Sequence, residues 1–241
     1  MSIPEKSRGN SIRTIEKVLI RNIRKILLCW GQNNYFDFPW RSTDNHFHAL
    51  VAEILLQRTR AEQVVPVFRK FASDYSTIDK ASEEDPKKIL ELLRPLGLEC
   101  RARRIVELIT MLSQNKCKIP VSNKELLNLP GVGFYAASAY STFHANIRAL
   151  IVDSNSVRLW SRVFGFKADD ETRRKKDFRQ LVNSVTPKRN HKKFNYAVLD
   201  FTRCVCKPKP LCEICPLISL CSYYQKKSVS TNLSDRSFRR I

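Results

Sequence analysis

The spacing of apolar residues is the feature that most restricts what this chain can fold into. Between residues 11 and 31 apolar side chains recur every three or four positions, and the opposite face is basic. The same spacing continues along most of the chain, nothing alternates as a β-strand would, and the 241 residues include only 6 glycines. We therefore predict an all-α protein with short loops between antiparallel helices. The predicted helices cover residues 11–31, two segments of 48–75 that part near Arg58–Arg60, 85–96, 101–113, 123–129, 134–143, 154–164, 172–185 and 191–203.

The charge of the chain indicates a polyanionic partner. Lysine and arginine number 43 against 23 aspartate and glutamate, a net charge of +20, while 43% hydrophobic residues exclude a disordered basic protein. Residues 172–193 carry nine Lys and Arg against one Asp and are expected to line a DNA groove. No apolar run approaches the roughly 18 residues of a membrane span, and the N-terminus lacks an apolar signal stretch. We expect a cytoplasmic protein with no membrane partner.

Five of the eight cysteines lie between residues 204 and 221, which indicates a metal centre. The predicted ligands, spaced C-x5-C-x2-C-x5-C, are Cys206, Cys212, Cys215 and Cys221. Four thiolates can hold one zinc ion or an iron–sulfur cluster, and the long arms outside the central pair favour a [4Fe-4S] cluster. Cys204 is an alternative to Cys206 as first ligand. The cluster is expected to order the loop that carries Lys207 and Lys209 toward DNA phosphate.

The sequence LPGVG at 129–133 connects two short predicted helices. Its glycines permit a tight turn, which predicts a helix-hairpin-helix. The N–H groups of such a turn, at the start of the second helix, can hold a DNA phosphate, with a monovalent cation as a possible bridge. The predicted DNA contacts here are Gly131, Val132 and Gly133. An ordinary connection between helices is the alternative interpretation.

Asp153 stands at the start of another predicted helix. It follows four apolar residues and precedes Asn155 by two positions. Asp and Asn are both good N-caps, so capping is one predicted role, and it does not exclude a chemical one.

Six blocks of the sequence, in order, resemble the helix-hairpin-helix DNA glycosylase superfamily in its endonuclease III and MutY branch. They are FPWR at 38–41, AEILLQRT at 52–59, LGLECRARRI at 96–105, LPGVGFYAA at 129–137, VDSNSVRLWSR at 152–162 and LDFTRC at 199–204. The resemblance covers roughly residues 11–223. It implies a six-helix barrel domain at 46–150 and an iron–sulfur cluster domain made of 1–45 and 151–223. A basic, mobile tail is expected at 224–241.

The resemblance also implies catalytic roles for four residues. Asp153 matches the essential aspartate that stabilises positive charge on deoxyribose as the N-glycosidic bond breaks. Glu53 matches the glutamate that protonates the leaving base and then activates water. Asn155 matches the polar partner that orients Asp153 or a water. Tyr135 stands where bifunctional endonuclease III has its nucleophilic lysine, so we expect no Schiff base and no strand cleavage.

The resemblance places three residues against the base stack of the DNA. Gln57 and Arg58 match the loop that enters the stack, and Leu98 matches the opposing wedge, used when a base is flipped out. With Tyr135 and the short chain, Arg58 and Leu98 are similar to those of the small G·T mismatch thymine-DNA glycosylases. We therefore expect a monomer that removes thymine or uracil opposite guanine in double-stranded DNA. Two alternatives remain open: an adenine glycosylase acting on A·G pairs, and a non-catalytic DNA-binding module stiffened by the cluster.

Overall fold

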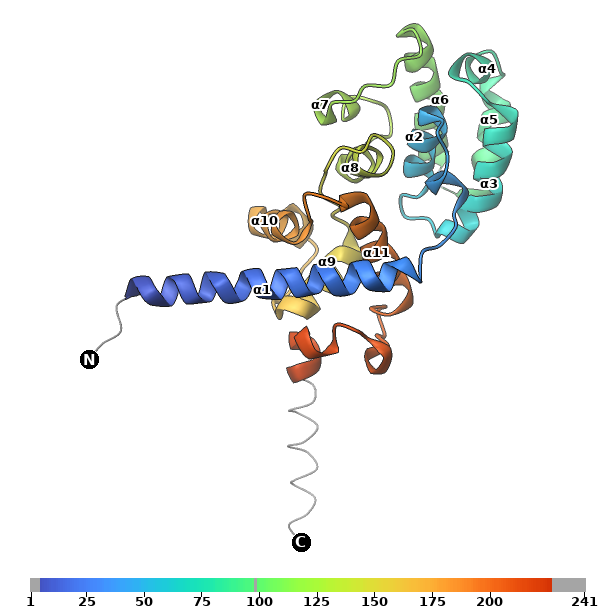
Figure 1. The fold of residues 1–241 in the computed structure, drawn as a ribbon. Helices are drawn as coiled ribbons and strands as arrows, with labels where there is room; N and C mark the ends of the chain where they lie inside the picture. Colours follow the sequence, from blue (N-terminus) through green and yellow to red (C-terminus); the bar gives the residue numbers. More distant parts are fainter. Residues whose placement is uncertain (1–4, 98, 227–241) are drawn as a thin grey trace, which may run out of the picture. The chain divides into compact units, whose positions relative to one another are not determined.

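The computed structural model describes residues 5–97 and 99–226, and all regular elements in these ranges are helical (Figure 1). The absence of strands from the described residues confirms the all-α prediction. By their contacts the described residues form two compact units. The first contains the chain up to Tyr35 and from Leu150 onward, and the second is Phe36–Ala149.

The second unit is built around α2, a helix buried at every residue after its first. Every residue of α2 from Phe47 to Leu55 is buried, and α2 packs against α3, α6 and α8. Because α2 buries side chains on all of its faces, it needs packing partners on all sides and lies in the core of this unit. The elements of this unit are η1 (Pro39–Arg41), α2 (His46–Leu55), α3 (Ala61–Asp74), α4 (Ile78–Ser82), α5 (Pro86–Leu93), η2 (Arg94–Leu96), α6 (Glu99–Gln114), α7 (Asn123–Leu126) and α8 (Phe134–Phe143).

An aromatic stack brings residues before 46 into this second unit. The rings of Phe36 and Phe38 stack at 5.4 Å, and those of Phe38 and Trp40 at 4.9 Å. Trp40 then meets Phe68 of α3 edge-on at 5.7 Å. Because these large apolar faces bury against α3, the unit extends back to Phe36, whereas the sequence places the start of the barrel at 46.

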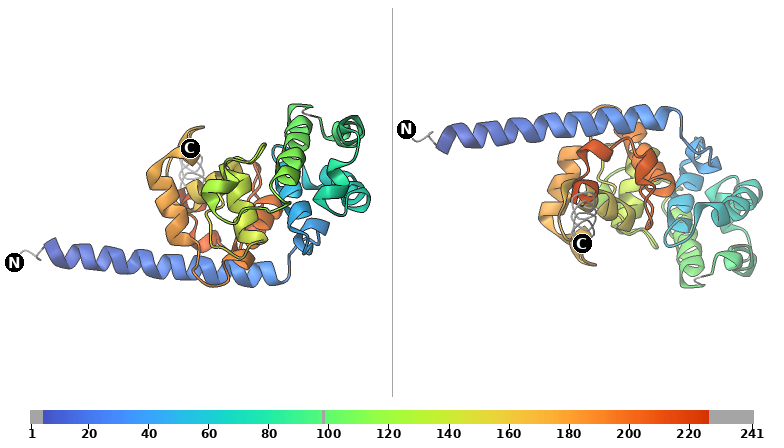
Figure 2. Two further views of the ribbon diagram at one scale, coloured as in Figure 1. Left: turned by 90° about the horizontal axis from the view of Figure 1, so that it is seen from above. Right: turned by 90° about the horizontal axis from the view of Figure 1, so that it is seen from below.

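The first unit packs a long N-terminal helix against a C-terminal one. Its elements are α1 (Glu5–Gln32), α9 (Ser154–Phe164), η3 (Thr172–Arg174), α10 (Lys176–Val185), α11 (His191–Cys204), η4 (Cys212–Ile214) and η5 (Ile218–Leu220). Figure 2 shows α1 as a continuous helix from two directions. Trp30 of α1 meets Phe201 of α11 edge-on at 5.2 Å. A Cβ atom at Gly31 would lie 2.7 Å from Cβ of Ala197, so only glycine allows this close approach.

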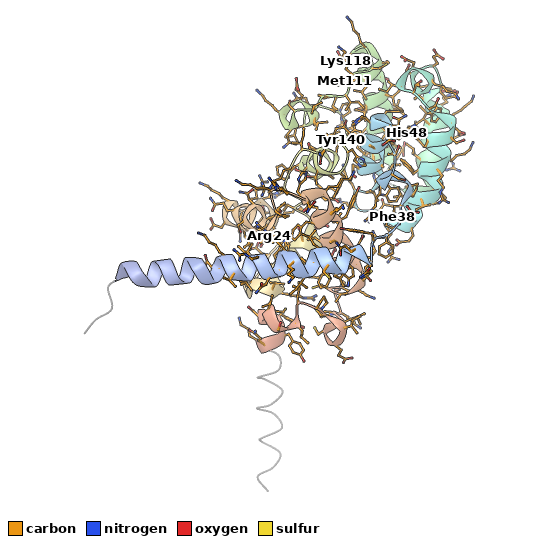
Figure 3. All side chains as sticks on the ribbon, viewed as in Figure 1. Arg24, Phe38, His48, Met111, Lys118 and Tyr140 are labelled. Atoms are coloured by element: carbon orange, nitrogen blue, oxygen red, sulfur yellow. The ribbon has the colours of Figure 1, made fainter. Side chains whose placement is uncertain are left out.

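Arg24 ties α1 to the end of α10. Its Nε and Nη2 atoms donate to the carbonyl oxygens of Val185 and Ser184, at 2.8 and 2.6 Å. A cation at this point satisfies carbonyls that a helix C-terminus leaves without partners, and it complements the helix dipole. Figure 3 labels Arg24 on α1.

Two local features differ from the predicted helices. Residues 172–185 form not one helix but η3 and α10, separated at Lys175, whose backbone is extended with φ −64° and ψ 135°. Asp169 explains the break, because it accepts hydrogen bonds from Thr172 Oγ1 at 2.8 Å and Lys175 Nζ at 2.6 Å and so holds the turn apart from α10. The short helix α4 was not predicted, since five residues give too little periodicity to detect.

The Gly31 contact predicts a sharp limit on side-chain size. Gly31→Leu should lower the free energy of unfolding by about 2 kcal/mol, because the side chain must push α1 from α11 although leucine favours a helix. Chemical denaturation measures the loss. Cys29→Leu, at an exposed position of the same helix, is the matched control and should change stability little. Equal midpoints for the Gly31→Leu protein and the unaltered protein would contradict the packing described.

Candidate functional site

The Asp153 carboxylate caps α9 in the first unit. Its Oδ1 accepts the N–H of Ser156 at 2.7 Å, and its Oδ2 accepts Nδ2 of Asn155 at 2.8 Å. The Ser156 hydroxyl oxygen accepts the Asp153 N–H at 2.9 Å, which completes a capping box. The helix cap is therefore present. Each carboxylate oxygen also has an N–H donor, and such donors stabilise a charged carboxylate and fix its orientation.

Arg158 carries this network on to the cysteine loop. Its Nη1 donates to Oδ1 of Asn155 at 2.9 Å, so the amide that holds Asp153 is itself held. Its Nε donates to the carbonyl of Cys206 at 2.9 Å, and its Nη2 to that of Thr202 at 3.1 Å. Burial lowers the pKa of Arg158, and a guanidinium stays charged even so. The start of α9, the end of α11 and the first predicted metal ligand are thus joined through one side chain.

Glu53 lies on the buried helix α2 of the second unit and is paired with a histidine. Its Oε1 is 3.2 Å from Nε2 of His144, and the two side chains are 4% and 2% exposed. His144 is the C-cap residue of α8, and its backbone N–H donates to the carbonyl of Tyr140 at 2.9 Å. A carboxylate this deeply buried requires a partner, and the imidazole supplies it.

A second histidine, His46, is linked to this pair through Tyr140. The hydroxyl of Tyr140 is 2.9 Å from Nδ1 of His46, and the Tyr140 ring centroid lies 6.1 Å from that of His144. Burial raises the pKa of Tyr140 to about 12, so the phenol stays neutral at physiological pH. Figure 3 labels Tyr140 within α8. Tyr135 lies on the first turn of α8, half-buried.

The glycine turn before α8 has the tight backbone that its sequence predicts. Gly131 has φ +77°, and a Cβ atom there would lie 3.4 Å from Cγ2 of Ile54. Gly133 is exposed and begins α8 without a side-chain cap, which leaves the first-turn N–H groups available for a ligand. The side chain of Val132 does not lie on the surface of the turn, and its predicted contact with DNA stays a prediction. Its side chain is 6% exposed and its N–H donates to the Leu129 carbonyl at 3.1 Å, so it packs beneath the turn.

The loop after α2 is tied to the glycine turn. Nε2 of Gln57 donates to the carbonyl of Gly131 at 3.0 Å, so the two segments predicted to contact DNA lie side by side. Arg58 is exposed and adopts the left-handed conformation, with φ 57°, which is uncommon for a residue with a side chain. In this structure Gln57 therefore anchors the loop, and Arg58 is its exposed residue.

Arg101 of α6 also holds the loop after α2 through hydrogen bonds. Its Nη1 donates to the carbonyl of Leu55 and to Oγ1 of Thr59, the latter at 2.7 Å. Its Nη2 is buried without a hydrogen-bond partner, and burial lowers the pKa of Arg101. Burying a guanidinium costs free energy unless it is hydrogen-bonded. The hydrogen bonds that Arg101 donates to Leu55 and Thr59 offset part of this cost and hold the loop in one conformation.

The four predicted metal ligands lie in the segment after α11, and none forms a disulfide: Cys206, Cys212, Cys215 and Cys221. Burial raises the pKa of Cys215 to about 11, and the charges of the other three thiols act in the same direction. Burial also raises the pKa of Cys204, whose charged neighbours are Asp200, Arg203 and Lys207. Cys206 as the first ligand, with Cys204 as the alternative, stays a prediction.

The iron–sulfur cluster expected in this loop stays a prediction. Within residues 5–97 and 99–226, no three His, Cys, Asp or Glu side chains are arranged to hold a metal ion. An iron–sulfur cluster is larger than one ion, so its four thiolates need not converge on one point. Four thiols within sixteen residues, none of them in a disulfide, are donors of the kind that such a cluster takes.

Arg162 orders the lysine-bearing part of the cysteine loop. Its Nη1 and Nη2 donate to the carbonyls of Lys207 and Pro208 at 2.6 and 2.8 Å, and its Nη1 lies 3.4 Å from Sγ of Cys206. The side chains of Lys207 and Lys209 are exposed. Arg162 of α9 therefore fixes the backbone beneath the two predicted phosphate contacts.

Acidic residues just before the basic segment 172–193 offset part of its charge. Arg174 pairs with Glu171 at 2.8 Å, and Lys175 pairs with Asp169 at 2.6 Å, all four side chains being exposed. The Lys175 and Thr172 hydrogen bonds lower the pKa of Asp169 to about 2. The exposed bases of the segment that remain for a polyanion include Arg173, and Lys188 and Arg189 beyond α10.

Two predictions concern residues outside the described ranges. Leu98, the expected wedge, lies outside them, immediately after Gly97 with φ 66°. Of the tail expected at 224–241, residues 227–241 also lie outside them, whereas 222–226 are helical. No helix among the described residues has the length and apolarity needed to cross a membrane.

Sequence reasoning missed the residues that support the predicted ones. His144, Arg101, Arg158 and Arg162 received no role, although three of them stand inside the blocks that carry the resemblance. Arg158 follows Asn155 by three positions on α9, a spacing that places two side chains on one helix face and could have been noticed. The contact between His144 and Glu53 joins residues 91 positions apart, and no local pattern reveals it.

Comparison with known proteins gives matches over most of the chain. The profile of the family described as "HhH-GPD superfamily base excision DNA repair protein" matches residues 51–184. A thymine/uracil-DNA glycosylase of Methanothermobacter thermautotrophicus is 32% identical over 86% of this chain and 94% of its own. A thymine-DNA glycosylase of Aeropyrum pernix is 34% identical over 87% and 97%. A solved structure of a thermostable thymine-DNA glycosylase is 31% identical, with a TM-score of 0.81 over 88% of this chain and 99% of that one.

The Arg158 network predicts a large loss of stability when its guanidinium is removed. Arg158→Met keeps the length of the side chain but leaves Asn155 Oδ1 and two backbone carbonyls without this donor, which should cost about 2–3 kcal/mol of unfolding free energy. Chemical denaturation measures it. Arg173→Met, at an exposed position of η3, is the matched control and should lie within about 0.5 kcal/mol of the unaltered protein. Similar losses in both variants would show that the network contributes nothing.

Proposed function

The chain belongs to the HhH-GPD superfamily of base excision DNA repair proteins, and on that basis we propose that it is a DNA glycosylase for mismatched thymine. Its substrate would be thymine or uracil opposite guanine in double-stranded DNA, and its reaction hydrolysis of the N-glycosidic bond. Such mispairs arise when 5-methylcytosine or cytosine is deaminated. Similarity to two proteins named as thymine glycosylases, along most of both chains, supports this choice of base.

The observation that carries the proposal is the Asp153 carboxylate, with an N–H donor on each oxygen. As the bond from C1′ to the base breaks, positive charge develops on the sugar. A carboxylate fixed beforehand stabilises that charge without reorganising during the reaction. Asn155 and, through it, Arg158 act as positioning residues for this carboxylate.

Glu53 would act as the general acid and then as the base. In its protonated form it gives its proton to the leaving base as the C1′–N bond breaks and the bonding electron pair leaves with the base. The resulting carboxylate then takes a proton from a water whose oxygen forms the new bond to C1′. The products are the free base and an abasic site in an intact strand.

Tyr135 supports a monofunctional reaction. A bifunctional enzyme forms a Schiff base between an amine and the sugar, and a phenol cannot form one. Because Tyr135 occupies the second position of α8, directly after the glycine turn, we assign it a polar contact with the bound nucleotide.

The turn and the loop tied to it would grip DNA. Gly131 and Gly133 offer backbone groups at the start of α8 to a phosphate, with a monovalent cation as a possible bridge. Arg58, exposed on the loop that Gln57 anchors, would enter the base stack opposite the wedge at Leu98. Lys207 and Lys209 would contact phosphate from the cysteine loop.

We propose a [4Fe-4S] cluster as the resident cofactor of the unit formed by both ends of the chain. Cys206, Cys212, Cys215 and Cys221 would hold it. When bound, it would serve as a structural cross-link of the loop that carries the lysines. Arg158 donates to the Cys206 carbonyl, so order in this loop supports the position of Asp153 through a continuous set of hydrogen bonds.

Base release from a panel of duplexes tests the proposed reaction. We expect thymine and uracil to be released opposite guanine, with far slower release of adenine from A·G and A·8-oxoguanine pairs, and strands that stay intact until alkali is added. Asp153→Asn should reduce release at least a hundredfold while DNA binding persists, an order of magnitude typical of lost transition-state electrostatics. Preferred release of adenine, or nicking before alkali, would contradict the assignment. Undiminished release by Asp153→Asn would contradict the mechanism.

Iron and sulfide analysis of cysteine variants tests the cofactor. The purified protein should contain about four iron and four sulfide per chain. Cys206→Ser should lower this content, whereas Cys204→Ser, the matched control two residues away, should not. Zinc in place of iron would show that the cluster assignment is wrong. Loss of iron from Cys204→Ser but not from Cys206→Ser would show that Cys204, and not Cys206, is the first ligand.

A further inference from the structure

Glu53 and His144 form a deeply buried contact between ionisable side chains in the second unit. Its two side chains are 4% and 2% exposed, with 3.2 Å between Oε1 and Nε2. Two further ionisable groups are linked to it: Tyr140, whose ring centroid lies 6.1 Å from that of His144, and His46, whose Nδ1 is 2.9 Å from the Tyr140 hydroxyl. The contact with His144 engages Oε1 of Glu53 and does not use Oε2. One oxygen of the carboxylate is thus held by His144, and the other takes no part in that contact.

Physical chemistry restricts how protons are distributed over this pair. A lone carboxylate or a lone imidazolium in so buried a place would be costly, whereas a pair that carries one ionisable proton between its members is neutral overall. That proton can lie on the imidazole, giving an ion pair, or on Oε2, giving two neutral groups. Nε2–H of His144 can donate to Oε1 in both arrangements.

We propose that His144 is a positioning residue that acts through Glu53, an inference that rests on the proposed function. Its Nε2–H holds Oε1 in place, so that Oε2 faces the nucleotide. When Oε2–H gives its proton to the leaving base, the carboxylate that forms keeps the hydrogen bond from His144. The same carboxylate then accepts a proton on Oε2 from the attacking water, and the pair returns to its starting state. No proton is gained or lost by His144 over the cycle.

Another histidine in the same unit, His48, shows the contacts expected of a histidine with a structural role only. His48, also on α2 and 8% exposed, has Nε2 only 2.8 Å from the carbonyl of Tyr75. That contact joins a side chain to the backbone and reaches no carboxylate. His48 and His144 are thus the same residue type in the same unit, and they differ in their partner.

Single-turnover base release over a range of pH values, with the full chain and its cofactor, tests the inference. His144→Ala should slow release about tenfold or more while the affinity for a duplex that contains an abasic-site analogue stays within about twofold. His144→Gln, which keeps an N–H donor but cannot titrate, should recover part of the rate and give a rate–pH profile of altered shape. His48→Gln should lower thermal stability without changing the rate or the profile. An unaltered rate and profile in His144→Ala would overturn the proposal.

A measurement that does not depend on base release separates this inference from the proposed function. In the ¹⁵N NMR spectrum of the histidine rings, Nε2 of His144 should carry a proton with the signature of a hydrogen bond to a carboxylate. Glu53→Gln should change that signal and leave the His48 signal as it was. An Nε2 atom of His144 without a proton, or a signal unaffected by Glu53→Gln, would overturn the pairing. If no duplex releases a base while the signals behave as expected, the function is wrong and the pair stands.

Discussion

The hydrogen bonds of the Arg158 guanidinium hold together the part of the first unit that matters for chemistry. Asp153 is fixed by Asn155, Asn155 by Arg158, and Arg158 by carbonyl groups at the end of α11 and at Cys206. Each of these hydrogen bonds is short-range and directional. A shift of the Asp153 carboxylate would therefore disturb the hydrogen bonds to the cysteine loop. A structural cofactor in that loop would therefore affect catalysis without contacting DNA, because it would help to hold the Asp153 carboxylate in position.

The second unit depends instead on buried polar groups that are expensive to place. Glu53 stands on a helix that is buried from Phe47 to Leu55, and Arg101 lies beneath the loop after that helix with one nitrogen unsatisfied. Neither position favours stability, because an apolar side chain would pack there at lower cost. Both are understandable if the unit must present a proton and a rigid loop to a ligand.

The segments proposed to contact DNA are prepared before any DNA binds. Gly131 provides the left-handed turn and, through its carbonyl, the anchor for Gln57. Arg58 is already in an uncommon backbone conformation, held between bonds on both sides. Order of this kind lowers the entropy lost on binding, which helps to offset the energy needed to unstack and flip a base.

The sequence by itself determined the helical class, the glycine turn, the cap at Asp153 and the four adjacent thiols. These are local properties: apolar spacing, backbone freedom at glycine, side chains that bond their own helix start, and ligands a few residues apart. The division at Phe36, the burial of Val132, and the pairings of Glu53 with His144 and of Arg101 with the loop after α2 were decided by tertiary structure alone. The reason is distance along the chain. A hydrogen bond between residues dozens of positions apart leaves no periodic trace, and a charged residue reads as a surface residue until its neighbours cover it.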